Sequence, residues 1–312
     1  MSGRPASLRA ELAEYLALRR ALGFGLRNAG RLLGQYVGFM EDHHMDTVTT
    51  DNALSWASLP ADVSPIWLAV RMSAVRGFAT YLHSMGTADQ VPPTGLVRSG
   101  PCRATPYLYS AADVEALVGA AGALRPRLRA ATYQTLIGLL AVTGARVGEV
   151  IALDDSDLDR ERALLSVRNT KFNKSRLVPL HATALRALEA YTGLRDELRR
   201  RPKSPALFVS TAGTRLHHSN VGLTFARLAS QAGLTRRSAS CRPRIHDMRH
   251  SFAVASLVDA YASGADVPAM MPLLATFLGH SDPKHTYWYL SSAPELMALA
   301  GKRLEMRKGD RP

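Results

Sequence analysis

A segment rich in proline and glycine divides this chain of 312 residues into two unequal parts. Residues 89–106 contain four prolines and two glycines. Proline fixes its own φ angle, lacks a backbone donor and restricts the residue before it, so such a run favours extended chain over a helix or a strand. The sequence therefore predicts two domains, residues 1–90 and residues 107–312, joined by a linker over residues 91–106.

The first part carries apolar side chains at helical spacing in several stretches. Helices are expected over residues 7–22, 28–42 and 64–84, with a short one that is capped by Thr50 or Asp51 and runs to Trp56. Ser64 is a suitable N-cap for the last of these helices, and Pro65 fits its first position, where no backbone donor is needed. We expect a small all-helical domain with its aromatic side chains in the core.

The second part mixes helices with short strands. A long apolar helix is expected over residues 127–143, ending at Gly144. Two strands are expected at residues 164–168 and 176–180, joined by a polar hairpin loop, and residues 207–210 are a candidate further strand. The remainder is expected to be mostly helical. The predicted fold class is mainly α with a small antiparallel β-sheet.

The charge of the chain is concentrated in the second part. The formal net charge is +13; residues 1–100 hold 9 basic and 8 acidic side chains, and the remaining residues hold 30 and 18. This surplus predicts an anionic partner such as nucleic acid, although a basic, solvated surface would give the same totals. The two cysteines show no metal-site spacing, and no apolar run approaches the ~18 residues of a membrane helix. We expect a cytoplasmic, nucleoid-associated protein without a membrane partner.

Side chains suited to phosphodiester chemistry recur in the second part. His246 and Arg249 are three residues apart, which places them on one face of a helix, while Arg146 and His280 lie in other segments. Planar guanidiniums stabilise the charge of a phosphoryl-transfer transition state. Six Lys stand against 33 Arg, and Lys171 in the hairpin loop is a candidate proton donor, because Lys can lose a proton and Arg effectively cannot. Each residue alone would be an ordinary helix-end charge, structural histidine or loop lysine.

These residues occur in motifs that resemble those of the tyrosine recombinases, the family of phage integrases and Xer-type strand transferases. Residues 143–149 resemble its TGxRxxE box, and residues 170–180 resemble the β-hairpin whose first Lys is catalytic. Residues 246–253 resemble its HxxRH-[ST]-FA box, and residues 278–280 its LGH box. The family's nucleophilic tyrosine lies nine residues after the last histidine, which here is Tyr289.

The resemblance implies an attack of Tyr289 on a DNA phosphorus, which leaves a 3′-phosphotyrosine without metal, ATP or another cofactor. The implied catalytic residues are Arg146, Lys171, His246, Arg249, His280 and Tyr289. The two arginines and His280 are expected to bind the non-bridging oxygens, Lys171 to protonate the leaving 5′-oxygen, and His246 to act as base and later as acid.

Three neighbours are placed outside the reaction itself. Glu149 is expected to hold Arg146 by a salt bridge, and His250 to pack or hydrogen-bond beside the site. Tyr287 precedes Tyr289 by two residues, so on a helix it would point to nearly the opposite side, and the spacing favours Tyr289 as the nucleophile.

The resemblance also implies an assembly on double-stranded DNA. A SAM-like N-terminal domain and the catalytic domain would clamp the duplex, and four protomers would synapse two recombination sites. Residues 292–307 carry an apolar helix face, expected to dock on a neighbouring protomer as an exchange helix, with its own domain as the alternative acceptor. Companion recombinases or DNA-bending proteins remain open as partners. The Tyr-Trp-Tyr run at residues 287–289 resembles transposon-borne members.

Two other functions fit the same residues. A type IB topoisomerase would relax supercoils with this set, and a DNA-binding accessory protein would keep the fold without cleaving. The small N-terminal helical domain favours a recombinase over a topoisomerase. The complete set from Arg146 to Tyr289 favours an active enzyme over an accessory protein.

Overall fold

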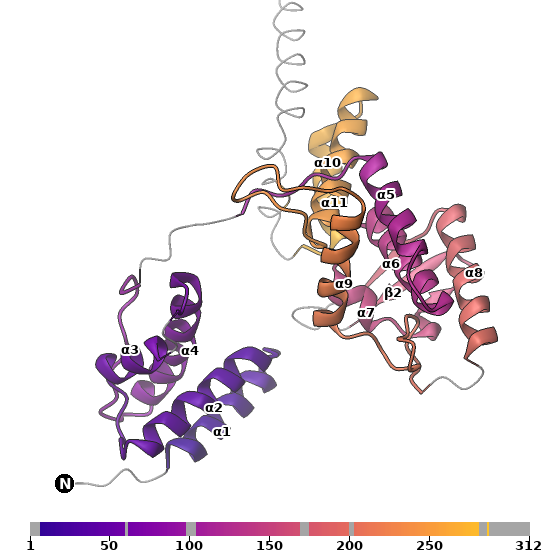
Figure 1. Cartoon of the computed structure of the whole chain (residues 1–312). Helices are drawn as coiled ribbons and strands as arrows, with labels where there is room; N and C mark the ends of the chain where they lie inside the picture. The colour runs from indigo at the N-terminus through magenta and orange to yellow at the C-terminus, as the bar shows by residue number, and fades with distance from the viewer. Residues whose placement is uncertain are drawn as a thin grey trace, which may run out of the picture. The chain divides into compact units, whose positions relative to one another are not determined.

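The computed structural model describes residues 7–59, 62–97, 104–168, 175–199, 203–280 and Thr286. They form two compact units, one among residues 7–97 and one from residue 104 onward (Figure 1). Within the described residues the first unit contains helices only, and the second combines helices with one three-stranded antiparallel sheet. The predicted fold class, mainly α with a small antiparallel sheet, is confirmed.

Capping side chains set the helix starts of the first unit. Its helices are α1 (Leu8–Ala21), α2 (Arg27–Asp42), α3 (Thr50–Ser58) and α4 (Pro65–Ser84). The Ser64 hydroxyl accepts the N–H of Trp67 at 3.3 Å, as its predicted capping role requires. The predicted cap of α3, Thr50 or Asp51, was wrong, because the cap is Thr49. The Thr49 hydroxyl accepts the N–H of Asn52 at 3.2 Å, and Asn52 Oδ1 accepts the N–H of Thr49 at 3.0 Å. This reciprocal pair fixes the start of the helix.

Aromatic side chains lie in the core of the first unit, as predicted. Tyr36 and Trp56 are buried with their ring centroids 5.2 Å apart, and the Tyr36 hydroxyl donates to Asn52 Oδ1 at 2.7 Å. The Arg71 guanidinium lies 3.9 Å from the centroid of the Trp56 ring and donates to the Trp56 carbonyl oxygen at 2.5 Å. These rings join α2, α3 and α4 and are not available to stack on bases.

Helix α6 (Arg127–Thr143) lies at the centre of the second unit. The other helical elements there are α5 (Ala111–Gly122), α7 (Val147–Ala152), η1 (Asp155–Asp157), α8 (Ala182–Leu198), α9 (His218–Gln231), α10 (Asp247–Ala262) and α11 (Val267–Leu278). Helix α6 packs against α5, α8 and α10, and it has buried residues on most of its circumference (Figure 1). Its C-terminal end therefore comes to lie inside the unit, close to α10.

The sheet contains the two predicted strands and one more. The strands β1 (Leu158–Asp159), β2 (Leu164–Val167) and β3 (Arg176–Pro179) are antiparallel in the order β1-β2-β3. Leu165 pairs with Val178, and both are buried. The loop between β2 and β3 that carries Lys171 lies outside the described residues from 169 to 174.

The candidate strand at residues 207–210 was a wrong prediction. In this stretch only an isolated bridge joins Val209 to Arg215 among the described residues. Other groups satisfy its backbone: the Leu207 carbonyl accepts from Arg195 Nη1 at 3.0 Å, and the Val209 N–H donates to the Tyr191 hydroxyl at 3.2 Å. A buried apolar run with these partners needs no neighbouring strand.

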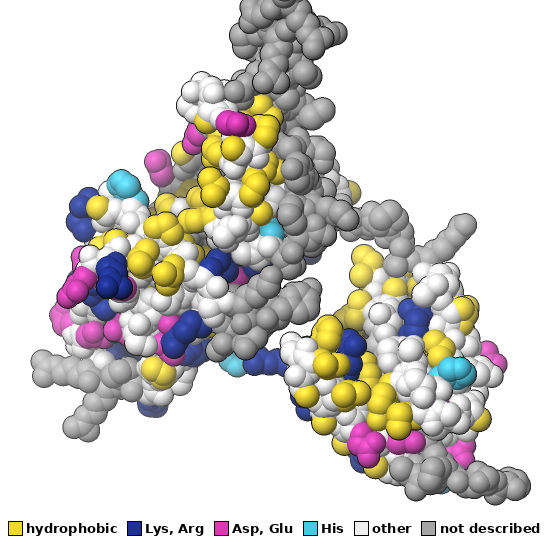
Figure 2. Space-filling model, turned by 180° about the vertical axis from the view of Figure 1, so that it is seen from behind, with side chains coloured by type: hydrophobic (Ala, Val, Ile, Leu, Met, Phe, Trp, Pro, Cys, Tyr) yellow, Lys and Arg dark blue, Asp and Glu magenta, His cyan; other side chains and the backbone are white. Residues whose placement is uncertain are grey.

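Hydrophobic and charged side chains are both present on the face of the molecule in Figure 2. On the face in Figure 2, Lys and Arg side chains occur on both units, with acidic side chains among them. The basic surplus of the second part is therefore not gathered into one patch on this face. Among the described residues, no helix combines the length and the apolar character that crossing a membrane requires.

Candidate active site

Gly144 fixes the turn that follows α6. It ends the helix in the left-handed conformation, with φ at 57°. A Cβ atom at this position would lie 2.6 Å from Cδ1 of Phe252 on α10 and 3.0 Å from Cδ2 of Leu278 on α11. Both the backbone and the packing therefore require glycine. The turn brings the end of α6 against α10 and α11 and places Arg146 at the N-cap of α7.

Arg249 lies in the first turn of α10 and exposes only 2% of its surface. Its Nη1 donates to the Gly144 carbonyl oxygen at 2.9 Å, and its Nη2 donates to the Leu278 carbonyl oxygen at 2.6 Å. A buried guanidinium is costly unless its donors are satisfied, and these helix-end carbonyls satisfy them. The same two bonds tie α10 to the ends of α6 and α11.

Arg146 is the more accessible arginine, with 36% of its side chain exposed. The salt bridge expected with Glu149 is present, since Arg146 Nη1 donates to Glu149 Oε1 at 2.7 Å. The backbone N–H of Arg146 donates to Glu149 Oε2 at 3.0 Å, and its Nη2 donates to the Gly279 carbonyl oxygen at 3.3 Å. Arg146 is thereby held at both its backbone and its guanidinium.

A third arginine, Arg176 on β3, belongs to the same network and was not predicted as a site residue. Its Nη1 and Nη2 donate to Oε1 and Oε2 of Glu149 at 3.2 and 2.7 Å, and its Nε donates to the Phe277 carbonyl oxygen at 2.9 Å. Burial alone would raise the pKa of Glu149, but the hydrogen bonds and charge of Arg176, with those of Arg146, lower this pKa to about 2. Glu149 is therefore ionised at neutral pH.

The three arginines meet at the last turn of α11. The final carbonyl groups of a helix have no partner within it and carry the negative end of the helix dipole. Three consecutive ones each accept a guanidinium N–H, those of Phe277, Leu278 and Gly279 from Arg176, Arg249 and Arg146 in that order. Arg146 and Arg249 are therefore held next to each other, beside the next residue of the chain, His280.

His246 directly precedes α10 and keeps an exposed side chain. Partial loss of hydration lowers its pKa below the usual 6.5, and the charges of Arg249 and Arg146 lower it further, against the opposing effect of Asp247. At neutral pH the ring is thus uncharged and can accept a proton. The His250 ring lies edge-on to it, with the centroids 5.4 Å apart.

His280 follows the αL glycine that ends α11. Its backbone N–H donates to the Ala275 carbonyl oxygen at 2.9 Å, and its Nδ1 lies 2.7 Å from Oγ1 of Thr286, which is fully buried. If Thr286 donates in this bond, His280 carries its own proton on Nε2. The contact with Thr286 therefore fixes the orientation of the ring and leaves Nε2 as its other polar atom.

The structure brings four of the six predicted catalytic residues to the junction of α6, α10 and α11. These are Arg146, His246, Arg249 and His280. Lys171, Tyr289 and the alternative Tyr287 lie outside the described residues, so their roles stay predictions from the motifs.

The strand pattern carried a signal for Arg176. Alternate residues of a strand share a face, and Val178, two residues further along β3, is buried. An arginine on the inward face of a strand needs acceptors inside the protein. The sequence does not indicate that Glu149 and the Phe277 carbonyl are the acceptors of Arg176.

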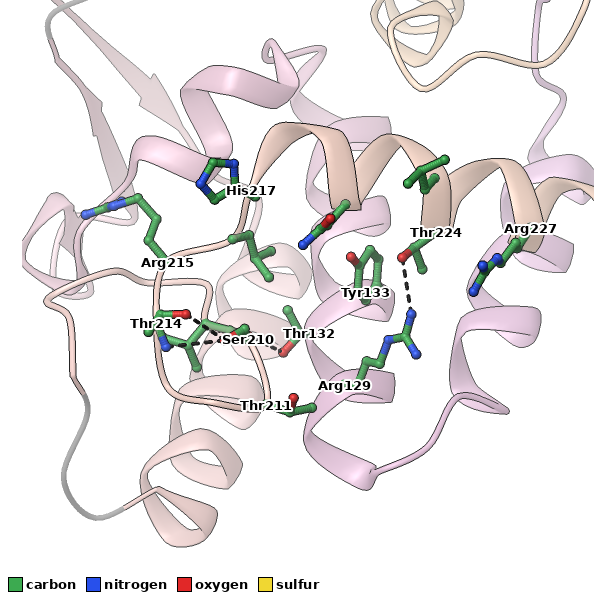
Figure 3. A pocket seen from close by; sticks show the side chains of 14 residues that line it. Arg129, Thr132, Tyr133, Ser210, Thr211, Thr214, Arg215, His217, Thr224 and Arg227 are labelled. Atoms are coloured by element: carbon green, nitrogen blue, oxygen red, sulfur yellow. Dashed lines mark hydrogen bonds between the residues drawn. The ribbon is translucent and has the colours of Figure 1, made fainter.

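A cavity of about 450 Å³, lined by polar and apolar side chains, lies elsewhere on the same unit, between α6, α9 and residues 209–217 (Figure 3). None of the 14 described residues that line it is acidic, and three are arginines. Arg129 Nη2 donates to Thr224 Oγ1 at 3.2 Å, and Arg215 is paired with Asp154, whereas Arg227 is exposed. The cavity shares no residue with the site at the end of α11, and its lining suits an anion.

Comparison with known proteins identifies the family. The model of the Phage integrase family matches residues 109–295, more than half of the chain. The Sinorhizobium fredii protein y4rB, provisionally named an integrase/recombinase, is 42% identical over 98% of this chain and 99% of its own length. Tyrosine recombinase XerD of Rhizobium meliloti is 36% identical over 71% of this chain and 68% of its own.

Solved structures share the fold. XerH recombinase bound to palindromic difH DNA aligns with a TM-score of 0.64 at 18% identity, covering 90% of this chain and 80% of that one. A lambda integrase tetramer bound to a Holliday junction aligns with a TM-score of 0.61 at 18% identity, covering 92% and 78%. At these identities the likeness shows the fold alone. The sequence relatives and the family match show more: this chain belongs to the phage integrase family of tyrosine recombinases.

Proposed function

We propose that the protein is a site-specific DNA recombinase or integrase that cleaves and rejoins strands through a 3′-phosphotyrosine intermediate. The observation that supports this chemistry most is the pair Arg146 and Arg249, held side by side on consecutive carbonyls of α11. Two oriented guanidiniums suit the non-bridging oxygens of a phosphodiester, whose negative charge spreads in the transition state. Since Arg146 and His246 are the accessible members, the phosphate would enter from their side, with Arg249 behind it.

In the proposed cleavage step, the phenolic oxygen of Tyr289 forms a bond to phosphorus and the bond to the 5′-oxygen breaks. His246, uncharged at neutral pH, takes the phenol proton, and Lys171 gives a proton to the departing 5′-oxygen. His280 would donate from Nε2 to a non-bridging oxygen, because Thr286 engages Nδ1. One ester replaces another, so cleavage needs no ATP. In rejoining, a 5′-hydroxyl attacks the phosphotyrosine and gives its proton to Lys171, the bond from phosphorus to Tyr289 breaks, and His246 returns the proton to the phenol oxygen.

The proposed substrate is double-stranded DNA with specific recombination sites, bound by a tetramer. The related folds of XerH and lambda integrase are solved on difH DNA and, as a tetramer, on a Holliday junction. We assign residues 1–90 to DNA clamping, residues 91–106 to the linker and residues 107–312 to catalysis, with residues 292–307 exchanged between protomers. The cavity of Figure 3 would contact the DNA backbone through Arg227.

A strand-exchange assay tests the function against its alternatives. The DNA is a duplex that the full chain selects by binding from a randomised library, cloned into two plasmids of different size. A recombinase joins the two plasmids into a larger product that contains the sequences of both. Relaxed plasmids without joined products would indicate a topoisomerase. Bound DNA that is neither relaxed nor joined would indicate an accessory protein and contradict the proposal.

A further inference from the structure

Arg176 is part of the site, but its guanidinium is largely buried and bound to protein groups. Its side chain is 11% exposed, against 36% for Arg146. Each of its three nitrogens donates to a protein oxygen: Nε to the Phe277 carbonyl, and Nη1 and Nη2 to the two oxygens of Glu149. Both of its Nη atoms contact a carboxylate, so Glu149 occupies the face of this guanidinium that a phosphate would need. The effect of Arg176 on the reaction must come through the groups that it holds.

The first of these groups is Glu149, which two arginines share. A carboxylate and a guanidinium prefer a two-bond fork, and Arg176 occupies that fork. The Arg146 guanidinium makes one bond to Glu149, from Nη1 at 2.7 Å, and its Nη2 donates to Gly279 instead. Without Arg176, Glu149 Oε2 would keep only the backbone N–H of Arg146 as a partner and could accept from the Arg146 guanidinium as well. The guanidinium of Arg146 would then turn from α11 toward Glu149.

The second group is the end of α11. Gly279 has φ at 68°, and a Cβ atom there would lie 2.7 Å from Nη1 and 3.1 Å from Cζ of Arg176. The guanidinium thus fills the space against the turn whose carbonyls hold Arg146 and Arg249. Its bond to the Phe277 carbonyl fixes the first of the three carbonyls and joins β3 to this turn.

We propose that Arg176 is a positioning residue: by taking both oxygens of Glu149 and the carbonyl of Phe277, it keeps Arg146 on the end of α11, where Arg146 can meet the scissile phosphate. This rests on the proposed function and adds a residue to its machinery. Arg176 acts on the rate of strand cleavage through Arg146, and not on the affinity for DNA.

A double-mutant cycle on the full chain tests the proposal, with single-turnover cleavage of a nicked duplex as the readout. In Arg176→Gln the maximal cleavage rate falls roughly 100-fold, the size expected for loss of one oriented donor, while the DNA concentration for half-saturation stays the same. Arg146→Lys slows cleavage as well. The double variant is no slower than Arg146→Lys alone, because both changes remove the same contribution.

Arg195→Gln is the matched control. Arg195 also donates to a backbone carbonyl, that of Leu207 at 3.0 Å, and pairs with a carboxylate, Asp155 at 3.1 Å, but it lies outside this site and outside the cavity of Figure 3. It should leave the maximal rate unchanged and be additive with Arg146→Lys. Arg176→Lys tests whether misfolding explains the loss, because it keeps a cation beside Glu149. A lysine cannot bind both oxygens of Glu149 and the Phe277 carbonyl at once. This variant should therefore show the same slow cleavage as Arg176→Gln.

Three results would overturn the positioning role while the proposed function stands. In the first, the double variant is slowed by the product of both single effects. In the second, Arg176→Gln loses affinity for DNA but keeps the full maximal cleavage rate. In the third, Arg176→Lys cleaves at the wild-type rate. Absence of cleavage by the wild type on DNA that it binds would remove the proposed function itself, and the positioning role with it.

Discussion

At the scale of single residues, two titratable side chains are held in the states that the proposed reaction needs. Glu149 is ionised because two guanidiniums oppose the effect of burial on its pKa, which lies at about 2. His246 is mainly uncharged at neutral pH because partial loss of hydration and neighbouring cations lower its pKa below 6.5. A neutral imidazole can take the tyrosine proton, and an ionised carboxylate can hold two arginines.

The lowered pKa of His246 gives a pH prediction for the DNA-free protein. Its ring should titrate with a midpoint below 6.5 in an NMR experiment, and Arg249→Gln should raise that midpoint because it removes a cation. As pH falls, the apparent second-order cleavage rate should decline around the measured midpoint, because that rate reports the free enzyme. A midpoint above 6.5 would contradict this electrostatic description.

The residues of the site differ in how far the sequence predicted them. The Arg146–Glu149 salt bridge followed from a three-residue spacing on one helix start, which is a local property. Arg176 lies 27 residues from Glu149, and its carbonyl acceptor on Phe277 lies 101 residues away. Contacts of that kind depend on how β3 meets α11, so no local pattern could supply them.

At the scale of elements, the ends of three helices build the site. Helix α6 ends at Gly144, α10 begins after His246, and α11 ends at Gly279. Arginines satisfy the helix-end carbonyls where capping residues or water would otherwise be needed. Stability and catalysis therefore depend on the same bonds, and a change that displaces one helix end should affect both.

The turn at Gly144 tests this dependence. Gly144→Ala should destabilise the protein by about 3 kcal/mol, since it adds left-handed strain and a clash with Phe252 and Leu278. Gly233→Ala is the control, because Gly233 also has positive φ, at 73°, but no atom lies within 4 Å of the added Cβ, so it should cost about 1 kcal/mol. Urea midpoints measure both, and equal losses would show that packing at this turn is unimportant.

The start of α4 could be predicted from its own residues, whereas the structure of the run at residues 207–210 could not. Ser64 and Pro65 mark the start of α4 through chemistry contained in a few residues. The run at residues 207–210 has the composition of a strand, yet side chains of α8, Arg195 and Tyr191, satisfy part of its backbone. Whether an apolar run becomes a strand depends on a partner, which the run itself does not specify.

At the scale of the whole molecule, the net charge of +13 should appear as a salt dependence of DNA binding. Arg227→Gln, in the cavity of Figure 3, should weaken binding to all duplexes alike and reduce the slope of log affinity against log salt by about 1. Arg160→Gln is the control, because Arg160 is already paired with Asp155 at 3.3 Å. An unchanged slope in Arg227→Gln would exclude this cavity from the DNA interface.

The most direct test of the account is the identity of the residue that becomes attached to DNA. The protein is incubated with a nicked duplex of its selected site, the covalent complex is isolated under denaturing conditions, and the DNA-linked peptide is sequenced by mass spectrometry. We predict attachment at Tyr289, with loss of the complex in Tyr289→Phe and its retention in Tyr287→Phe. Attachment at Tyr287 or at another residue would contradict the assigned nucleophile, and a protein that cleaves without a covalent complex would contradict the mechanism.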